Sequence, residues 1–86
     1  MDINDLIAIV KKKLNREILI EKIDIEDKSF LHKKHSSNEK GKFHLKLTIN
    51  STELKRLSRI ERNKKVYKVL DQEIKECIHS LQILIY

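Results

Sequence analysis

Apolar residues recur with helical spacing at the beginning of the chain. They are Ile3, Leu6, Ile7, Val10 and Leu14. Asp2 is a candidate N-cap for this helix, and Asp5 places negative charge in its first turn, where the helix dipole favours it. Lys11, Lys12 and Lys13 fall near the other end, where positive charge complements the dipole. A dedicated anion site is the competing explanation for these lysines.

The next two apolar segments alternate with polar residues and are predicted to be strands. In residues 18–26 the alternation is partial, with Ile23 and Ile25 on one face. From Phe43 to Asn50 it is strict, which indicates one buried face and one wet face. Residues 28–42 lack either period and are predicted to form a loop. Loops of this length in compact domains are usually functional or disordered.

Two helices and a third strand are predicted after residue 50. Ser51 begins a short helix that extends to about Leu57, and Ser58 with Glu61 forms a candidate capping box for the next helix. We expect Glu61 to pair with Lys65 at i,i+4. The apolar face of this second helix comprises Val66, Val69, Leu70, Ile74, Cys77 and Ile78. Leu81, Ile83 and Ile85 alternate to the end as a strand that joins the sheet by a crossover.

The predicted order is helix, strand, strand, helix, helix, strand. This order favours an α+β fold of two layers, in which a three-stranded sheet carries its helices on one face. With 86 residues, the chain is expected to be a single domain over residues 1–86.

Composition narrows the function classes. A single cysteine, Cys77, cannot form an internal disulfide and fits a reducing compartment. The chain lacks an apolar run of membrane-spanning length and begins with an acidic rather than a basic segment, so we expect a cytoplasmic protein without a membrane partner. It contains neither a glycine-rich phosphate loop nor a nucleophile motif, and we expect that it is not an enzyme.

Positive charge is concentrated in residues 55–68. Seven basic residues oppose only Glu61 there, which gives 7 − 1 = +6, the net charge of the whole chain. Such a surface suits a polyanion or an acidic partner protein, and an ordinary solvated basic helix is the competing explanation. Single-stranded nucleic acid is less favoured, because Tyr67 is the only aromatic residue available for stacking. The candidate binding residues are Lys55, Arg56, Arg59, Arg62, Lys64 and Lys65.

Four histidines form the only unusual set of possible metal ligands. His32 and His35 lie in the predicted loop, His44 opens the second strand and His79 starts the third. If these two strands are neighbours, His44 and His79 would lie close together. For each histidine alone, a surface or structural role competes with metal binding. Cys77 is either a small buried thiol or one end of a Cys77-x-His79 chelate.

Four motifs in order resemble those of BolA-like proteins. Residues 27–32 (DKSFLH) resemble the D-x-S-x-x-H start of their loop, and residues 43–51 (FHLKLTINS) resemble their S/T-H-F strand ending in serine. Residues 62–67 (RNKKVY) resemble R-H-R-x-V-Y, and residues 79–81 (HSL) resemble the closing H-A-L. The resemblance covers nearly the whole chain.

The resemblance implies a class II KH-like fold and a function. BolA-like proteins pair with monothiol glutaredoxins and share a [2Fe–2S] cluster, for which the glutaredoxin supplies a cysteine and a glutathione thiol. On the side of this chain, the resemblance implies His79 as one ligand and His32, or alternatively His35, as the other, with His44 as possible support. It also implies a role in iron–sulfur cluster trafficking or iron homeostasis, and a monomer in the absence of the partner.

Some family members are DNA-binding transcriptional regulators, which makes the basic, helix-turn-helix-like segment 52–68 the alternative functional surface. Four positions depart from the family pattern. Asn63 and Lys64 replace the last two residues of R-H-R, Leu45 replaces an aromatic residue, and Arg56 replaces a glycine between helices. The G-x-x-G loop with which KH domains bind RNA is also absent from the sequence.

Overall fold

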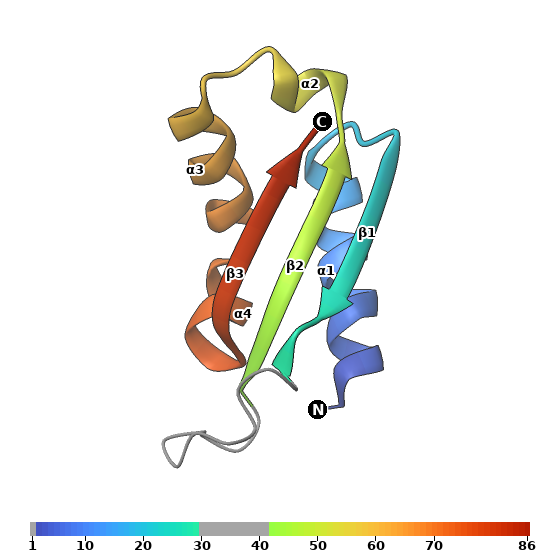
Figure 1. Ribbon diagram of the computed structural model, residues 1–86, viewed down its shortest axis with the longest axis vertical. Coiled ribbons are helices and arrows are strands. Elements are labelled where there is room, and N and C mark those ends of the chain that lie inside the picture. The colour runs from blue at the N-terminus through green and yellow to red at the C-terminus, as the bar shows by residue number, and fades with distance from the viewer. Residues whose placement is uncertain (1, 30–41) are drawn as a thin grey trace.

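The computed structural model describes residues 2–29 and 42–86. The helices and strands follow the chain as shown in Figure 1. They are α1 (Ile3–Glu17), β1 (Lys22–Asp27), β2 (Phe43–Asn50), α2 (Thr52–Lys55), α3 (Arg59–Val69), α4 (Asp71–Glu76) and β3 (Ile78–Ile85). Most of the predicted loop 28–42 lies outside the described residues.

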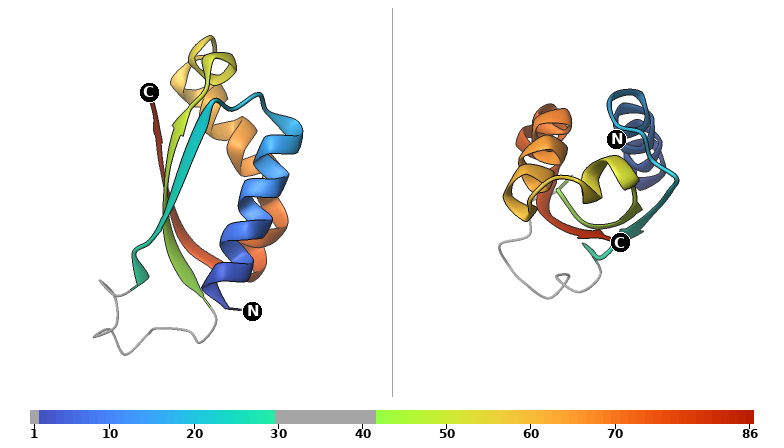
Figure 2. Two further views of the ribbon diagram at one scale, coloured as in Figure 1. Left: turned by 90° about the vertical axis from the view of Figure 1, so that its right-hand side faces the viewer. Right: turned by 90° about the horizontal axis from the view of Figure 1, so that it is seen from above.

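The three strands form one sheet in the order β1-β2-β3. β1 pairs with β2 in antiparallel orientation, whereas β2 and β3 are parallel and are joined through α2, α3 and α4. Figure 2 shows α1, α3 and α4 on one face of the sheet, with the other face uncovered. The predicted α+β fold, with its helices on one face and a crossover before the last strand, is therefore confirmed.

The core lies between the sheet and the helices. Leu45, Leu47 and Ile49 of β2 are almost completely buried and meet Leu6 and Val10 of α1 in one cluster of apolar side chains. Each such side chain contributes about 1.5–3 kcal/mol on burial. The strict alternation of β2 and the helical period of α1 therefore predicted these buried positions correctly, but His44, on the predicted wet face of β2, is buried as well.

Three helix starts are stabilised by the predicted side-chain caps. Asp2 Oδ1 accepts the backbone N–H of Asp5 at 3.0 Å, and Ser58 Oγ accepts that of Glu61 at 3.2 Å. Ser51 is fully buried; its Oγ accepts the N–H of Leu54 at 3.1 Å and donates to Leu19 O at 2.8 Å. Ser51 thus both starts α2 and ties the connection before β1 to the end of β2.

Several predicted details are wrong. β1 begins at Lys22 rather than at residue 18, because the N–H of Ile18 still bonds to Leu14 O and ends α1. The helix expected to continue to Ile78 ends at Val69, and the short α4 follows it.

Two further details in the C-terminal half also differ from the prediction. Ile78 belongs to β3 instead of a helix, since it pairs with Phe43, so this strand starts one residue before His79, where it was expected to start. Lys65 forms an ion pair with Glu53 Oε2 at 3.0 Å in place of the expected pairing with Glu61. None of the helices in the described part of the chain is long and apolar enough to cross a bilayer.

Candidate metal-ligand site and basic surface

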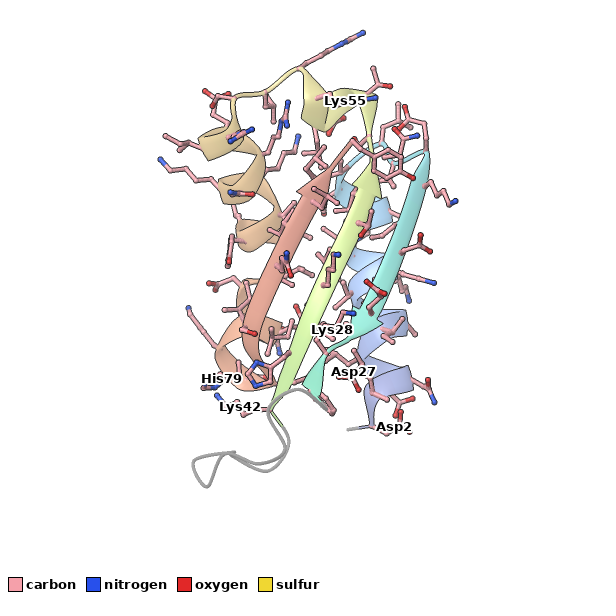
Figure 3. The ribbon with its side chains drawn as sticks, viewed as in Figure 1. Asp2, Asp27, Lys28, Lys42, Lys55 and His79 are labelled. Carbon is pink, nitrogen blue, oxygen red and sulfur yellow. The ribbon has the colours of Figure 1, made fainter. Side chains whose placement is uncertain are left out.

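His79 is exposed at the beginning of β3, at the end of the sheet where β2 also starts (Figure 3). The pairing between β2 and β3 is irregular here. Phe43 pairs with Ile78 and His44 pairs with Ser80, so His79 is an extra residue on β3. Such a bulge changes the direction in which a side chain points and is common next to functional sites.

His44 supports His79 from the neighbouring strand. Its ring centroid lies 4.9 Å from that of His79, with 54° between the ring planes. His44 is only 8% exposed, and its Nδ1 lies 2.7 Å from Ser80 Oγ. The expectation that strand pairing brings His44 and His79 together is therefore confirmed. The contact to Ser80 fixes the orientation of the His44 ring, against which the exposed His79 ring rests.

The described residues on either side of segment 30–41 lie at this end of the sheet. Ser29 Oγ accepts the backbone N–H of His44 at 3.1 Å, and Lys42 directly precedes β2. His32 and His35 themselves lie outside the described residues. Within residues 2–29 and 42–86, no three His, Cys, Asp or Glu side chains are arranged to hold a metal ion.

Cys77 is poorly suited to bind metal as a thiolate. It ends α4 and packs against the apolar core. Burial raises the pKa of its thiol, and the nearby carboxylates of Glu73 and Glu76 raise it further. Because a cysteine binds metal as the thiolate, this environment disfavours the Cys77-x-His79 chelate, and Cys77 is a half-buried thiol packed against the core.

Some of the predicted basic residues form hydrogen bonds or ion pairs within the chain. The Arg62 guanidinium donates from Nε to Leu54 O at 2.9 Å and Leu57 O at 3.0 Å, and from Nη2 to Lys55 O at 3.1 Å. Arg62 thereby connects α3 to the end of α2, a structural role that the sequence did not reveal. Lys65 is paired with Glu53, and Lys55 Nζ lies 3.4 Å from Asn50 Oδ1. Lys55 is nevertheless exposed, as are Arg56, Arg59 and Lys64.

The helices α1 and α3 enclose a basic groove that the sequence analysis missed. The groove has a volume of about 650 Å³. It is lined by Lys13, Arg16 and Glu17 of α1 and by Lys64, Lys65, Lys68 and Val69 of α3. The expected basic segment is therefore extended by cations from the first helix. Only the packing of α1 beside α3 reveals this, because the two sets lie about 50 residues apart in the sequence.

The exposed His79 and the basic groove lie on a chain whose family can be identified by comparison with known proteins. Residues 14–86 match the family model described as BolA-like protein. The chain is 28% identical over 78 residues to the DNA-binding transcriptional regulator BolA of Haemophilus influenzae, covering 91% of this chain and 73% of that protein.

Two further likenesses come from one plant protein. The chain is 29% identical over 80 residues to SufE-like protein 1 of Arabidopsis thaliana, and this match spans only 22% of that longer protein. Among solved structures, the BolA domain of SufE1 from Arabidopsis thaliana superposes with a TM-score of 0.78 at 25% identity, covering 99% of this chain and 92% of that domain. The chain therefore belongs to the BolA-like protein family.

Proposed function

We propose that this chain is the partner of a monothiol glutaredoxin and shares a [2Fe–2S] cluster with it, in iron–sulfur cluster trafficking or iron homeostasis. The observation that carries the proposal is the exposed His79 ring, supported by His44 at the end of the sheet where Ser29 bonds to the backbone of His44. An imidazole that binds a cluster shared between two proteins must be accessible to the partner and must keep its orientation. His79 meets both requirements.

The donor groups on this chain suit half of a cluster site. Imidazole is a good ligand for iron. His79 would provide one ligand, and His32 or His35 would provide the second. The partner's cysteine and a glutathione thiol would complete the set.

Histidine ligation would give the bound cluster distinct properties. Neutral imidazole in place of thiolate lowers the negative charge around the iron and raises the reduction potential. Since a histidine must lose its proton before it binds metal, mild acid should release the cluster from this chain first.

The first test is anaerobic co-purification with a monothiol glutaredoxin, followed by visible circular dichroism. We expect a [2Fe–2S] spectrum for the wild-type complex, and its loss or alteration for His79→Ala. Gln82→Ala is the matched control, because Gln82 is exposed further along the same strand and should leave the spectrum unchanged. A spectrum indifferent to His79→Ala would refute the proposed ligand.

The same spectra can identify the second ligand. His32→Ala and His35→Ala are compared individually, and only the ligand should change the spectrum. We favour His32, which follows the D-x-S motif of residues 27–32 at the family spacing. An effect of His35→Ala alone would assign the role to that residue.

The second candidate function is DNA binding by the basic groove. Two observations favour it: the groove joins cations from α1 and α3, and the Haemophilus influenzae relative is named a DNA-binding transcriptional regulator. Duplex affinity should then fall steeply with salt, by about 0.9 log units per tenfold salt increase for each phosphate contacted. Lys64→Ala and Lys68→Ala should each reduce this slope, whereas His79→Ala should not. A duplex affinity unaffected by both lysine variants would exclude the groove as the DNA site.

A further inference from the structure

Within residues 2–29 and 42–86, no strand pairs with the outer edge of β3. β3 pairs with β2 on its other side, and the bond from Tyr86 N–H to Ile49 O at 3.0 Å fixes the register of the parallel pair. In a parallel ladder, alternate residues bond to the neighbouring strand. The N–H and C=O groups of Leu81, Ile83 and Ile85 therefore point away from β2. Consistent with this, the Tyr67 hydroxyl donates to Leu81 O at 3.3 Å from the outer side.

The two edges of the sheet differ in their protection against strand addition. Charged side chains on an edge strand discourage its pairing with a strand of another chain. β1 contains Lys22, Asp24, Glu26 and Asp27 among its six residues. β3 has eight residues and contains neither a charged residue nor a proline. Of the two edge strands, β3 is thus the one that lacks charged residues to discourage strand addition.

The outer edge of β3 borders a hollow with apolar and basic walls. Arg59, Arg62 and Asn63 of α3 line it together with residues 83–85 of β3, and its volume is about 270 Å³. Leu84 and Tyr86 are each 49% exposed, and Tyr67 on α3 is 42% exposed. Figure 1 shows α3 alongside this edge of β3. An added strand would therefore meet the outward backbone groups of Ile83 and Ile85, the N–H of Leu81 (whose C=O is bonded to Tyr67), apolar side chains and the exposed Arg59.

We propose that this edge binds an extended acidic segment of a partner protein, which adds to β3 as a fourth strand. Backbone hydrogen bonds at Leu81, Ile83 and Ile85 would supply affinity, and carboxylates facing α3 would supply selectivity. A second copy of this chain fits the edge less well. Pairing β3 with itself would bring together two basic segments, each carrying +6 over residues 55–68. The proposal does not depend on cluster binding.

The test uses the isotopically labelled full chain and a blocked seven-residue peptide, Val-Asp-Val-Glu-Val-Asp-Val. A peptide with lysine in place of each acidic residue is the control. On addition of the acidic peptide, amide resonances of residues 81–85 should shift, and exchange of the Leu81, Ile83 and Ile85 amides with solvent should slow. Shifts along β1 instead, or equal binding of the lysine peptide, would overturn the proposal.

Charge reversal on the chain tests the selectivity. Arg59→Glu should weaken binding of the acidic peptide about fivefold or more, because an attraction becomes a repulsion. Glutamate is well tolerated at this first position of α3. Lys22→Glu is the matched control, since it changes the net charge equally at the opposite edge of the sheet, and it should have a smaller effect. Equal effects of the two variants, or a chain that sediments as a dimer with its β3 amides already protected, would refute an acidic peptide partner.

Discussion

The ion pair between Lys13 and Glu73 should contribute strongly to stability. Replacing Lys13 and replacing Glu73 should lower the free energy of unfolding by different amounts. Lys13 Nζ on α1 lies 2.6 Å from Glu73 Oε2 on α4, with 25% and 7% of the respective side chains exposed. Glu73 Oε1 is buried without a hydrogen-bond partner among the described residues. Lys13→Met would thus leave a buried carboxylate without its cation.

The magnitude follows from the burial of the pair. Removing one partner of a fully buried ion pair costs about 3–5 kcal/mol. Because Lys13 is partly exposed, water already screens the pair to some extent, and we expect a loss of about 2–3 kcal/mol. A chain of 86 residues has a free energy of unfolding of about 9 kcal/mol at a typical 0.1 kcal/mol per residue. The variant would therefore lose about a quarter of its stability.

Urea unfolding followed by circular dichroism measures this loss. With a slope of about 1 kcal/mol per molar urea, the Lys13→Met midpoint should fall by about 2–3 M. Glu73→Leu should cost less, about 1 kcal/mol, because the freed lysine can extend its amino group into water. The double variant should recover most of the loss, since an apolar pair replaces a buried ionic one.

An exposed ion pair of similar length provides the control. Lys75 and Asp71 lie 3.0 Å apart with 73% and 63% of their side chains exposed. Lys75→Met should change the stability by less than about 0.5 kcal/mol. A Lys13→Met loss no larger than that of Lys75→Met would refute the argument from burial.

Three further predictions concern individual side chains. Arg62→Met should lower the free energy of unfolding by about 2 kcal/mol through loss of its bonds to α2 and the following turn, whereas Arg59→Met should stay within about 0.5 kcal/mol in the same urea assay. Equal effects would contradict the structural role of Arg62. Ser51→Ala should cost about 2 kcal/mol, because the hydroxyl both caps α2 and bonds to a backbone carbonyl. A loss below about 0.5 kcal/mol would count against the cap. The raised pKa of Cys77 means that iodoacetamide should alkylate it more slowly than free cysteine at pH 8, measured by mass spectrometry. Because the thiol pKa is higher in the folded state, the folded chain holds the thiol proton more tightly than the unfolded chain does. The resulting stabilisation is present below the ordinary thiol pKa and is lost as the pH rises through the folded pKa. Cys77→Ala should therefore remove this alkaline decrease in the free energy of unfolding.

Those helices and strands could be predicted whose residues follow a single period of apolar positions. The strict alternation of residues 43–50 identified β2, and the helical period of residues 3–14 identified α1. The start of β3 could not be found in this way, because Ile74, Cys77 and Ile78 fit a helical period as well as a strand. Pairing of Ile78 with Phe43 decides in favour of the strand, and it depends on a segment more than 30 residues away.

The site was predicted only in part for the same reason. The sequence placed His44 and His79 near the starts of their strands, but whether the two strands are neighbours was left open until the structure showed that β2 pairs with β3. The partners of long basic side chains depend on tertiary packing. Arg62 and Lys65 therefore had structural contacts that the sequence did not indicate. The contribution of Arg16 to the basic groove was hidden in the same way, because it requires α1 to lie beside α3.

The most direct test of the central proposal is pulsed electron paramagnetic resonance of the reduced complex with a monothiol glutaredoxin, in which only this chain carries ¹⁵N-labelled histidine. Ligation by His79 predicts a strong ¹⁵N coupling to the cluster, which His79→Ala removes or reduces while Gln82→Ala preserves it. A cluster-loaded complex without ¹⁵N coupling, or with coupling unchanged by His79→Ala, would contradict the account.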